Sequence, residues 1–216
     1  MKWTTAIGHV HGLAERCADM AELSSTIQTL SVTGLWAVGD ILGPPRDLDW
    51  VTVALVVDLP AAEVPWLCSP HGSQHWSQAT RLSKNPVTAR WRSAHAPVWN
   101  HRIVRPVLIW DLAGGLRQNA LDAVREGCSA DFALPAPSPD EFRARMADEL
   151  AISAAALAAR TADYEAKRWS RTPLERIADP LFEAVQGYLG VLEAQPHPSR
   201  PLSGGHPEAP TVSPQA

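Results

Sequence analysis

Two carboxylates stand two positions apart where a polar loop meets an apolar segment. Asp47 and Asp49 directly precede the run WVTVALVV at residues 50–57. In an extended chain, residues i and i+2 point to the same side and lie roughly 6.6 Å apart along the strand. Carboxylates placed in this way can share a hard divalent cation such as Mg²⁺ or Mn²⁺, which prefers oxygen ligands and keeps open positions for phosphate. The pair is therefore a candidate metal site.

Two-metal transfer of a nucleotidyl group needs such a site, because one ion activates the attacking oxygen and the other stabilises the leaving phosphate. A third carboxylate on a neighbouring strand would complete the site. Asp111, which ends the run VLIWD, is the best candidate for the third ligand and for a general base. Asp58 is the weaker one, because nine positions separate it from Asp49 and a regular strand would turn it to the other face. The alternative interpretation is a polar turn, since Asp favours turns that follow proline.

The residues around this pair resemble the motif of a known superfamily. Gly39 and Asp40 follow a short apolar run, Gly43 lies in the next loop, and Asp47-Leu48-Asp49 enters the following strand. This order resembles the nucleotidyltransferase superfamily, including its minimal and aminoglycoside-modifying members, where a Gly-Ser pair stands in place of Gly39-Asp40. The resemblance covers about residues 1–115, and the whole chain also resembles a bacterial protein family with no assigned function.

The resemblance carries implications for fold and ligands. It implies a small mixed sheet flanked by helices, often followed by a C-terminal helical bundle. It also implies that Gly39, Asp40 and Gly43 contact a nucleoside triphosphate and that the aspartates hold Mg²⁺ or Mn²⁺. In the family the Ser helps to hold the triphosphate, whereas a carboxylate at that position would repel it unless a metal ion were bound.

A second group of candidates lies in a stretch without acids. No Asp or Glu occurs between Val64 and Trp110, so positive charge there could surround a triphosphate or a nucleic acid. Arg81 and Lys84 are the best candidates for phosphate contact, because they fall in a loop near a predicted helix end. A nucleic-acid partner would need four cations on one exposed face: Arg81, Lys84, Arg90 and Arg92.

Three tryptophans share the acid-free stretch: Trp76, Trp91 and Trp99. They could stack on bases. The favoured interpretation is that they are core anchors, since Trp usually buries most of its surface.

The hydrophobic pattern predicts the elements that must position these residues. Helices are predicted at residues 3–22, 73–83 and 116–126, the last with Gly127 as its cap. Strands are predicted at residues 34–38, 50–57 and 87–93, and from Val107 onward, because Pro106 removes a backbone donor.

The C-terminal part carries strong helix signals. Ser138-Pro139-Asp140-Glu141 is a capping box with proline in the first helical position, which predicts a helix to about Trp169. Thr172-Pro173-Leu174-Glu175 repeats the device for a second helix, and the short connection predicts an antiparallel pair.

These elements predict an α/β (α+β) fold in which a small mixed sheet is flanked by helices. We expect a nucleotidyltransferase-like domain at residues 1–127, a C-terminal helical extension at residues 138–194 and a disordered tail at residues 195–216, which has too little apolar content to fold.

Composition limits the classes of function. A net charge of -4 on 216 residues is too small to imply a nucleic-acid, membrane or acidic partner by itself. The three cysteines have no C-x-x-C spacing, which argues against a disulfide framework and a structural zinc site. No signal peptide is visible and no apolar run approaches a membrane span, so we expect a cytoplasmic protein without a membrane partner.

Two hypotheses follow. In the first, Asp47, Asp49 and Asp111 hold metal ions for nucleotidyl transfer from a nucleoside triphosphate to an unknown acceptor. In the second, the chain is a non-catalytic binding or assembly protein on a degenerate nucleotidyltransferase scaffold, with its C-terminal helices as the interaction surface, for example of a homodimer. Convergence of the three carboxylates would favour the first hypothesis. An Asp111 that points away, or an Arg46 that occupies the space between the aspartates, would favour the second.

Overall fold

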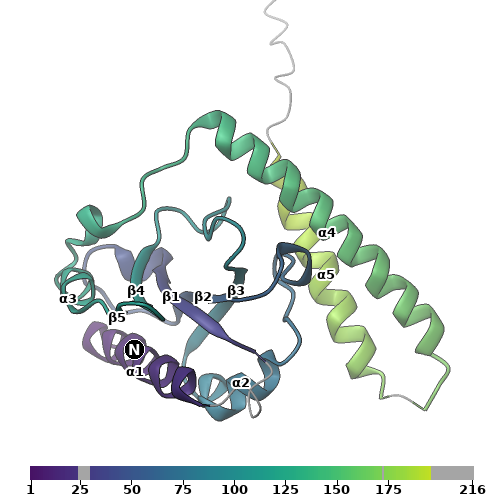
Figure 1. Ribbon diagram of the computed structural model, residues 1–216, viewed down its shortest axis with the longest axis horizontal. Helices are drawn as coiled ribbons and strands as arrows, with labels where there is room; N and C mark the ends of the chain where they lie inside the picture. Colours follow the sequence, from purple (N-terminus) through teal and green to yellow (C-terminus); the bar gives the residue numbers. More distant parts are fainter. Residues whose placement is uncertain (24–29, 172, 196–216) are drawn as a thin grey trace, which may run out of the picture.

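The computed structural model describes residues 1–23, 30–171 and 173–195, and its centre is a five-stranded mixed sheet. The strands are β1 (Val32–Val38), β2 (Val51–Val57), β3 (Val87–Ser93), β4 (Val107–Asp111) and β5 (Gly115–Leu116). Their order in the sheet is β3-β2-β1-β4-β5. β1 runs antiparallel to both β2 and β4, whereas β3 runs parallel to β2 (Figure 1). The predicted small mixed sheet is confirmed.

Helix α1 (Trp3–Glu22) covers one face of this sheet, as its apolar spacing predicts. Its buried side chains, among them Ile7 and Val10, share a core cluster with Val53 and Leu55 of β2. α3 (Gln118–Glu126) lies beside α1, and the indole N–H of Trp3 donates to the carbonyl of Arg125 at 2.8 Å. The predicted helices are therefore present, and α2 (Ser73–Ala79) is followed by a short 3₁₀ turn at Leu82–Lys84.

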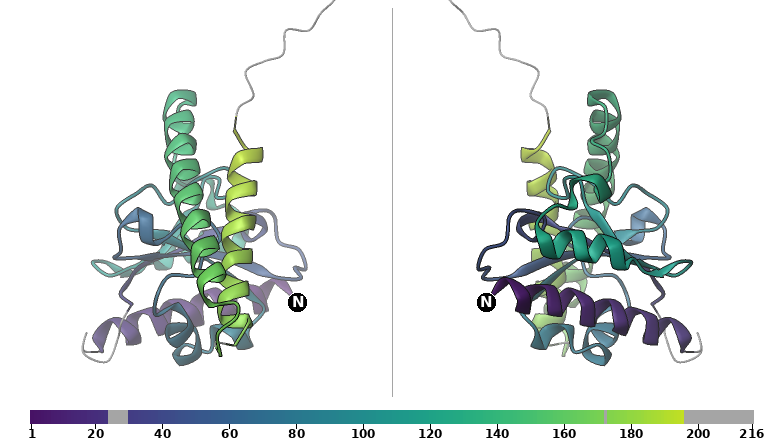
Figure 2. Two further views of the ribbon diagram at one scale, coloured as in Figure 1. Left: turned by 90° about the vertical axis from the view of Figure 1, so that its right-hand side faces the viewer. Right: turned by 90° about the vertical axis from the view of Figure 1, so that its left-hand side faces the viewer.

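The C-terminal chain forms two long helices, α4 (Pro139–Lys167) and α5 (Glu175–Glu193), which pack antiparallel beside the β3 edge (Figures 1 and 2). The predicted capping box opens α4: the Ser138 hydroxyl accepts from the Glu141 amide at 3.3 Å, and the Glu141 carboxylate accepts from the Ser138 amide at 2.8 Å. α5 begins at Glu175 with Leu174 at its N-cap position, two residues later than the predicted capping box implies, and that box depends on Thr172. Thr172 lies outside the described residues.

A second core cluster joins the helix pair to the other face of the sheet. It combines Val38 and Ala54 from the strands, Trp66 and Ile103 from loops, and Met146 and Val191 from the helices. Gly187 allows this approach, because a Cβ there would lie 2.0 Å from the carbonyl oxygen of Trp66. α4 and α5 therefore cover part of the second face of the sheet.

The remaining expectations concern the membrane and the tail. None of the described helices is both long enough and apolar enough to cross a membrane. Residues 196–216 of the predicted tail lie outside the described residues. Gln195, the first residue of that predicted tail, is described, and its side-chain amide donates to the carbonyl of Met146 at 2.9 Å.

Candidate anion-binding site

The three predicted metal ligands do not converge. Asp111 pairs with Gly34 at the start of β1, whereas Thr52, three residues after Asp49, pairs with Val38 at the end of β1. The four residue steps between Gly34 and Val38 alone correspond to roughly 13 Å. Asp111 thus lies at the opposite end of the sheet from the pair, and its predicted roles as third ligand and general base are wrong.

Asp111 instead holds the β4–β5 turn. One carboxylate oxygen accepts from the amides of Ala113 and Gly114 at 3.0 and 2.6 Å, and the other accepts from the Arg117 guanidinium at 3.0 Å. Burial would raise the pKa of Asp111, but these hydrogen bonds outweigh it and lower the pKa. Both carboxylate oxygens of Asp111 therefore accept hydrogen bonds that hold the turn after β4 in place.

The strands next to β2 offer no replacement for the third carboxylate. β1 and β3, the two neighbours of β2, contain no Asp or Glu, and β3 presents Thr88 and Arg90 beside Thr52 and Ala54. Asp58, the weaker candidate, lies beyond the far end of β2 and pairs with His95 at 2.9 Å. Within the described residues, no group of three or more His, Cys, Asp or Glu side chains could hold a metal ion. Residues Asp47 and Asp49 therefore do not fit a two-metal centre with Asp111.

The loop that carries the aspartate pair packs toward α1 and α3. The backbone amide of Leu48 donates to the carbonyl of Met1 at 3.0 Å, and a Cβ on Gly127 would lie 2.5 Å from Pro45. Asp47 and Asp49 are both exposed on this loop. Arg46 does not occupy the space between them but pairs with Asp40 at 3.0 Å.

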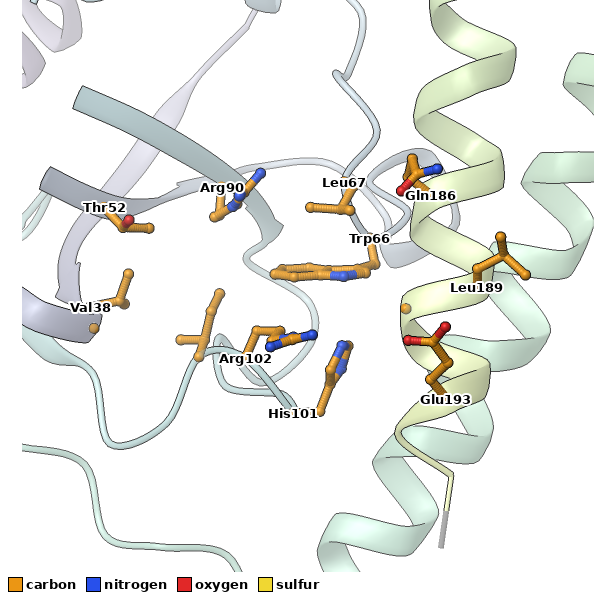
Figure 3. A pocket seen from close by; sticks show the side chains of 13 residues that line it. Val38, Thr52, Trp66, Leu67, Arg90, His101, Arg102, Gln186, Leu189 and Glu193 are labelled. Atoms are coloured by element: carbon orange, nitrogen blue, oxygen red, sulfur yellow. The ribbon is translucent and has the colours of Figure 1, made fainter. Parts of the chain in front are cut away.

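One of the predicted nucleotide-binding residues, Gly39, lines a cavity of about 480 Å³ between the sheet and α5 (Figure 3). Gly39 follows β1 with a φ of +72°, a backbone conformation that favours glycine. Asp40, Gly43, Arg81 and Lys84 do not line this cavity. Val38 and Thr52 form its sheet side, and Leu189 and Glu193 of α5 form its helix side.

Arg90 contributes a positive charge to the lining of this cavity. We call it the Arg90 cavity. The side chain extends from the centre of β3, and its guanidinium lies 6.0 Å from the centre of the Trp66 ring. Among the described residues it has no carboxylate partner, and its burial lowers the pKa of Arg90. A half-buried cation without an acid is costly unless an anion or an aromatic ring compensates it.

The loop after β3 adds His101 and Arg102 to the same wall. Asn100, which is buried, accepts from the backbone amides of Arg102 and Ile103, each at 2.9 Å. This turn fixes the backbone on both sides of His101, so that His101, Arg102 and Ile103 all line the cavity. The side chain of Arg102 is exposed at the cavity mouth.

A buried ion pair anchors that loop. Arg92 of β3 is 2% exposed and donates to the carbonyls of Pro97 and Val98 and to the carboxylate of Glu149 on α4. Glu149, which is 4% exposed, also accepts from Asn100 at 3.1 Å. The pair therefore links β3, the loop and α4, although burial lowers the pKa of Arg92 more than Glu149 raises it.

His101 is the titratable group of the cavity wall. Its ring packs edge-on to Trp66 with 5.5 Å between the ring centres, and its two ring nitrogens are buried without a hydrogen-bond partner among the described residues. Burial is the main cause that lowers the pKa of His101, and the charges of Arg102 and Arg92 lower it further, whereas Glu149 raises it. Burial thus favours the neutral imidazole, which has one N–H donor and one acceptor nitrogen, both without a partner among the described residues.

The tryptophans and cations of the acid-free stretch divide between the core and the surface. Trp76 and Trp91 are buried and pack edge-to-face at 5.7 Å, which confirms them as core anchors, whereas Trp99 is half-buried and stacks on Phe142. A single exposed face for the four cations is wrong, because Arg92 is buried in its ion pair.

The sequence interpretation missed the main members of the cavity wall, although a signal was present. Trp66, Arg90, His101 and Arg102 all fall between Val64 and Trp110, the stretch without Asp or Glu. Arg81 and Lys84 come from the same stretch but lie in the α2–β3 connection and are exposed. The acid-free composition marked the segment that lines the cavity, whereas position near a helix end picked out two cations that lie outside it.

Comparison with known proteins gives a family and no function. No curated protein and no solved structure matches the chain. The family described as "Domain of unknown function (DUF7711)" matches residues 1–197. The chain therefore belongs to the DUF7711 family.

Proposed function

We propose that this protein binds a small phosphate-bearing ligand of the nucleotide type in the Arg90 cavity and does not catalyse two-metal nucleotidyl transfer. The observation that carries the proposal is Arg90 itself. Its guanidinium is half-buried against Trp66, faces the cavity and has no acid partner among the described residues. An anion bound there would supply the missing countercharge.

The charge balance of the wall supports an anion. Arg90 and Arg102 contribute two guanidinium groups, whereas Glu193 contributes the one carboxylate of the lining. Guanidinium groups bind phosphate through paired hydrogen bonds, and partial burial strengthens such contacts because less water competes for them. Neutral His101 adds a hydrogen-bonding group beside them.

The size and position of the cavity favour a nucleotide over a bare phosphate ion. Its volume of about 480 Å³ falls within the range of small-molecule pockets. Gly39, one of the three residues that the nucleotidyltransferase resemblance assigns to the triphosphate, lines it at the end of β1. The helix–strand–loop–strand order of the first half of the chain is compatible with such a scaffold.

The proposal follows the second of our two hypotheses. Two-metal transfer would need a third acid next to Asp47 and Asp49, and neither β1 nor β3, the two neighbours of β2, carries one. Arg90, which lies farther along β3 opposite Ala54, suits direct binding of phosphate without a metal bridge. We also propose a cytoplasmic setting, which agrees with the three free thiols of the chain. The use of the C-terminal helices as an assembly surface stays a prediction, for which the exposed Phe182 and Leu192 of α5 are the candidates.

Thermal unfolding with a panel of ligands tests the proposal. The panel comprises the four ribonucleoside triphosphates, ADP, AMP and inorganic phosphate, each with EDTA and with Mg²⁺. Ligand at 100 times its Kd stabilises a folded protein by about 2.7 kcal/mol, which for a chain of this length raises the midpoint by about 5–10 °C. We expect at least one nucleotide to raise the midpoint in EDTA.

Matched variants locate the site. Arg90→Met keeps the alkyl packing on Trp66 but removes the charge, and Arg102→Gln removes the second cation; both should abolish the shift. Arg90→Met should not lower the midpoint without ligand, because it removes a half-buried cation that has no acid partner. Arg81→Gln, an exposed arginine outside the cavity, and Asp49→Ala should leave the shift unchanged. A shift that needs Mg²⁺ and disappears in Asp49→Ala, together with release of pyrophosphate, would overturn the proposal in favour of nucleotidyl transfer.

A further inference from the structure

A second hollow of about 390 Å³ lies beside the first turns of α4, where the linker from α3 meets the loop after β3. Its centre is formed by Trp99 and Phe142, whose rings stack with 6.4 Å between centres and 15° between planes. Val104, which is 63% exposed, lies on its rim. Three prolines complete the lining: Pro135, Pro137 and Pro139. We call this hollow the Trp99 groove.

The described chain ends next to this groove. The side chain of Gln195, the last described residue, donates to the carbonyl of Met146 at 2.9 Å. Met146 lies one helical turn from Phe142, a distance of roughly 5–6 Å along the axis. Because α5 runs antiparallel to α4, the chain leaves α5 toward the first turn of α4 (Figure 2).

The residues after Gln195 are rich in proline, and aromatic-lined grooves bind proline-rich segments. Residues 196–216 contain six prolines: Pro196, Pro198, Pro201, Pro207, Pro210 and Pro214. Aromatic-lined grooves recognise proline-rich segments in the polyproline II conformation, which has little conformational entropy left to lose. At about 3.1 Å per residue in that conformation, two or three residues after Gln195 reach the level of Phe142.

We propose that the Trp99 groove is occupied by the chain's own C-terminal segment, with residues 196–201 on the Trp99–Phe142 stack. Attachment through Gln195 gives this segment an effective concentration on the order of millimolar at the groove. Even weak docking is then populated, and a separate proline-rich protein at micromolar concentration competes poorly. The inference is independent of the ligand proposed for the Arg90 cavity.

Site-specific photo-crosslinking in the full-length chain tests this inference. p-Benzoylphenylalanine replaces Val104 on the groove rim or, as a matched control, Leu112, an exposed residue in the β4–β5 turn at the other end of the sheet. Both positions are exposed, so neither substitution disturbs the core. Mass spectrometry then identifies the crosslinked peptides in an equal mixture of ¹⁴N- and ¹⁵N-labelled chains.

We expect crosslinks from position 104 to peptides within residues 196–216, formed within one isotopic form. These crosslinks should be lost when Pro196, Pro198 and Pro201 are replaced by Ser, and they should be absent from position 112. Equal crosslinking after the proline replacements would show mere collision of a tethered segment and would overturn the proposal. Mixed-isotope crosslinks, which would place a second copy in the groove, or no crosslink to residues 196–216, would overturn it as well.

Discussion

The chemistry of the Arg90 cavity depends on groups that are held away from water without full compensation. Arg90 lacks an acid partner among the described residues, and both ring nitrogens of His101 lack a hydrogen-bond partner there. Proteins rarely retain such groups without a use for them, because each costs stability in the unliganded state. A ligand with phosphate oxygens would supply the countercharge that Arg90 lacks.

His101 makes the first prediction at the residue scale. Burial lowers its pKa in the folded chain below the ordinary value of 6.5. The unfolded chain therefore takes up this proton at a higher pH than the folded chain, so the free energy of unfolding should fall as the pH drops through 6.5 and level off below the folded pKa.

Urea unfolding between pH 8 and pH 5 would measure this dependence. In His101→Asn that part of the pH dependence should disappear, whereas His75→Asn, at an exposed position on α2, should retain it. Unfolding curves of His101→Asn that keep the full pH dependence of the wild type would contradict the assignment.

Glu149 makes the second residue-scale prediction. Glu149→Ala leaves Arg92 as a buried cation without its acid, which should lower the free energy of unfolding by about 3–5 kcal/mol. Glu165→Ala, at an exposed position on the same helix, should change it by less than about 0.5 kcal/mol. Equal urea midpoints for the two variants would show that the ion pair does not hold the loop and α4 together.

At the scale of elements, the close contact between α5 and the Trp66 loop depends on a single glycine. A Cβ at position 187 would lie 2.0 Å from the carbonyl oxygen of Trp66, so Gly187→Ala should push α5 away and destabilise the protein by about 1–3 kcal/mol. Gly8→Ala on α1 meets no atom within 4 Å and should instead stabilise it by about 0.5–1 kcal/mol. Thermal unfolding of both variants measures the difference, and a neutral Gly187→Ala would contradict the described packing.

The elements themselves were largely predictable from local patterns. The β-branched run of β2, the alternation in β3 and the capping box of α4 each report on residues close together in sequence. α5 begins at Glu175, two residues later than the Thr-Pro-Leu-Glu pattern predicts, and the amide of Arg176 in its first turn donates to the carbonyl of Pro173. A local motif indicates that a helix starts nearby, but contacts with the rest of the chain determine the residue at which it begins.

At the scale of the whole molecule, the order of the strands in the sheet determines which side chains line the cavity. That order cannot be read from any local sequence pattern. Asp111 was a reasonable third ligand as long as β4 could lie next to β2. β4 pairs with β1 instead and runs antiparallel to it, which places Asp111 at the far end of the sheet. The same order puts Arg90 of β3 beside β2, and the packing of α5 then closes the cavity over it. These contacts join residues far apart in sequence, so composition alone could mark only the segment that supplies them.

The most direct test of our account is a calorimetric titration of the wild-type chain with the nucleotide that gives the largest thermal shift, performed in EDTA and again in Mg²⁺. The account predicts binding of similar affinity under both conditions and its loss in Arg90→Met, because the guanidinium contacts the phosphate directly. Binding that requires Mg²⁺, persists in Arg90→Met and is lost in Asp49→Ala would contradict it and return the aspartate pair to the centre of the function.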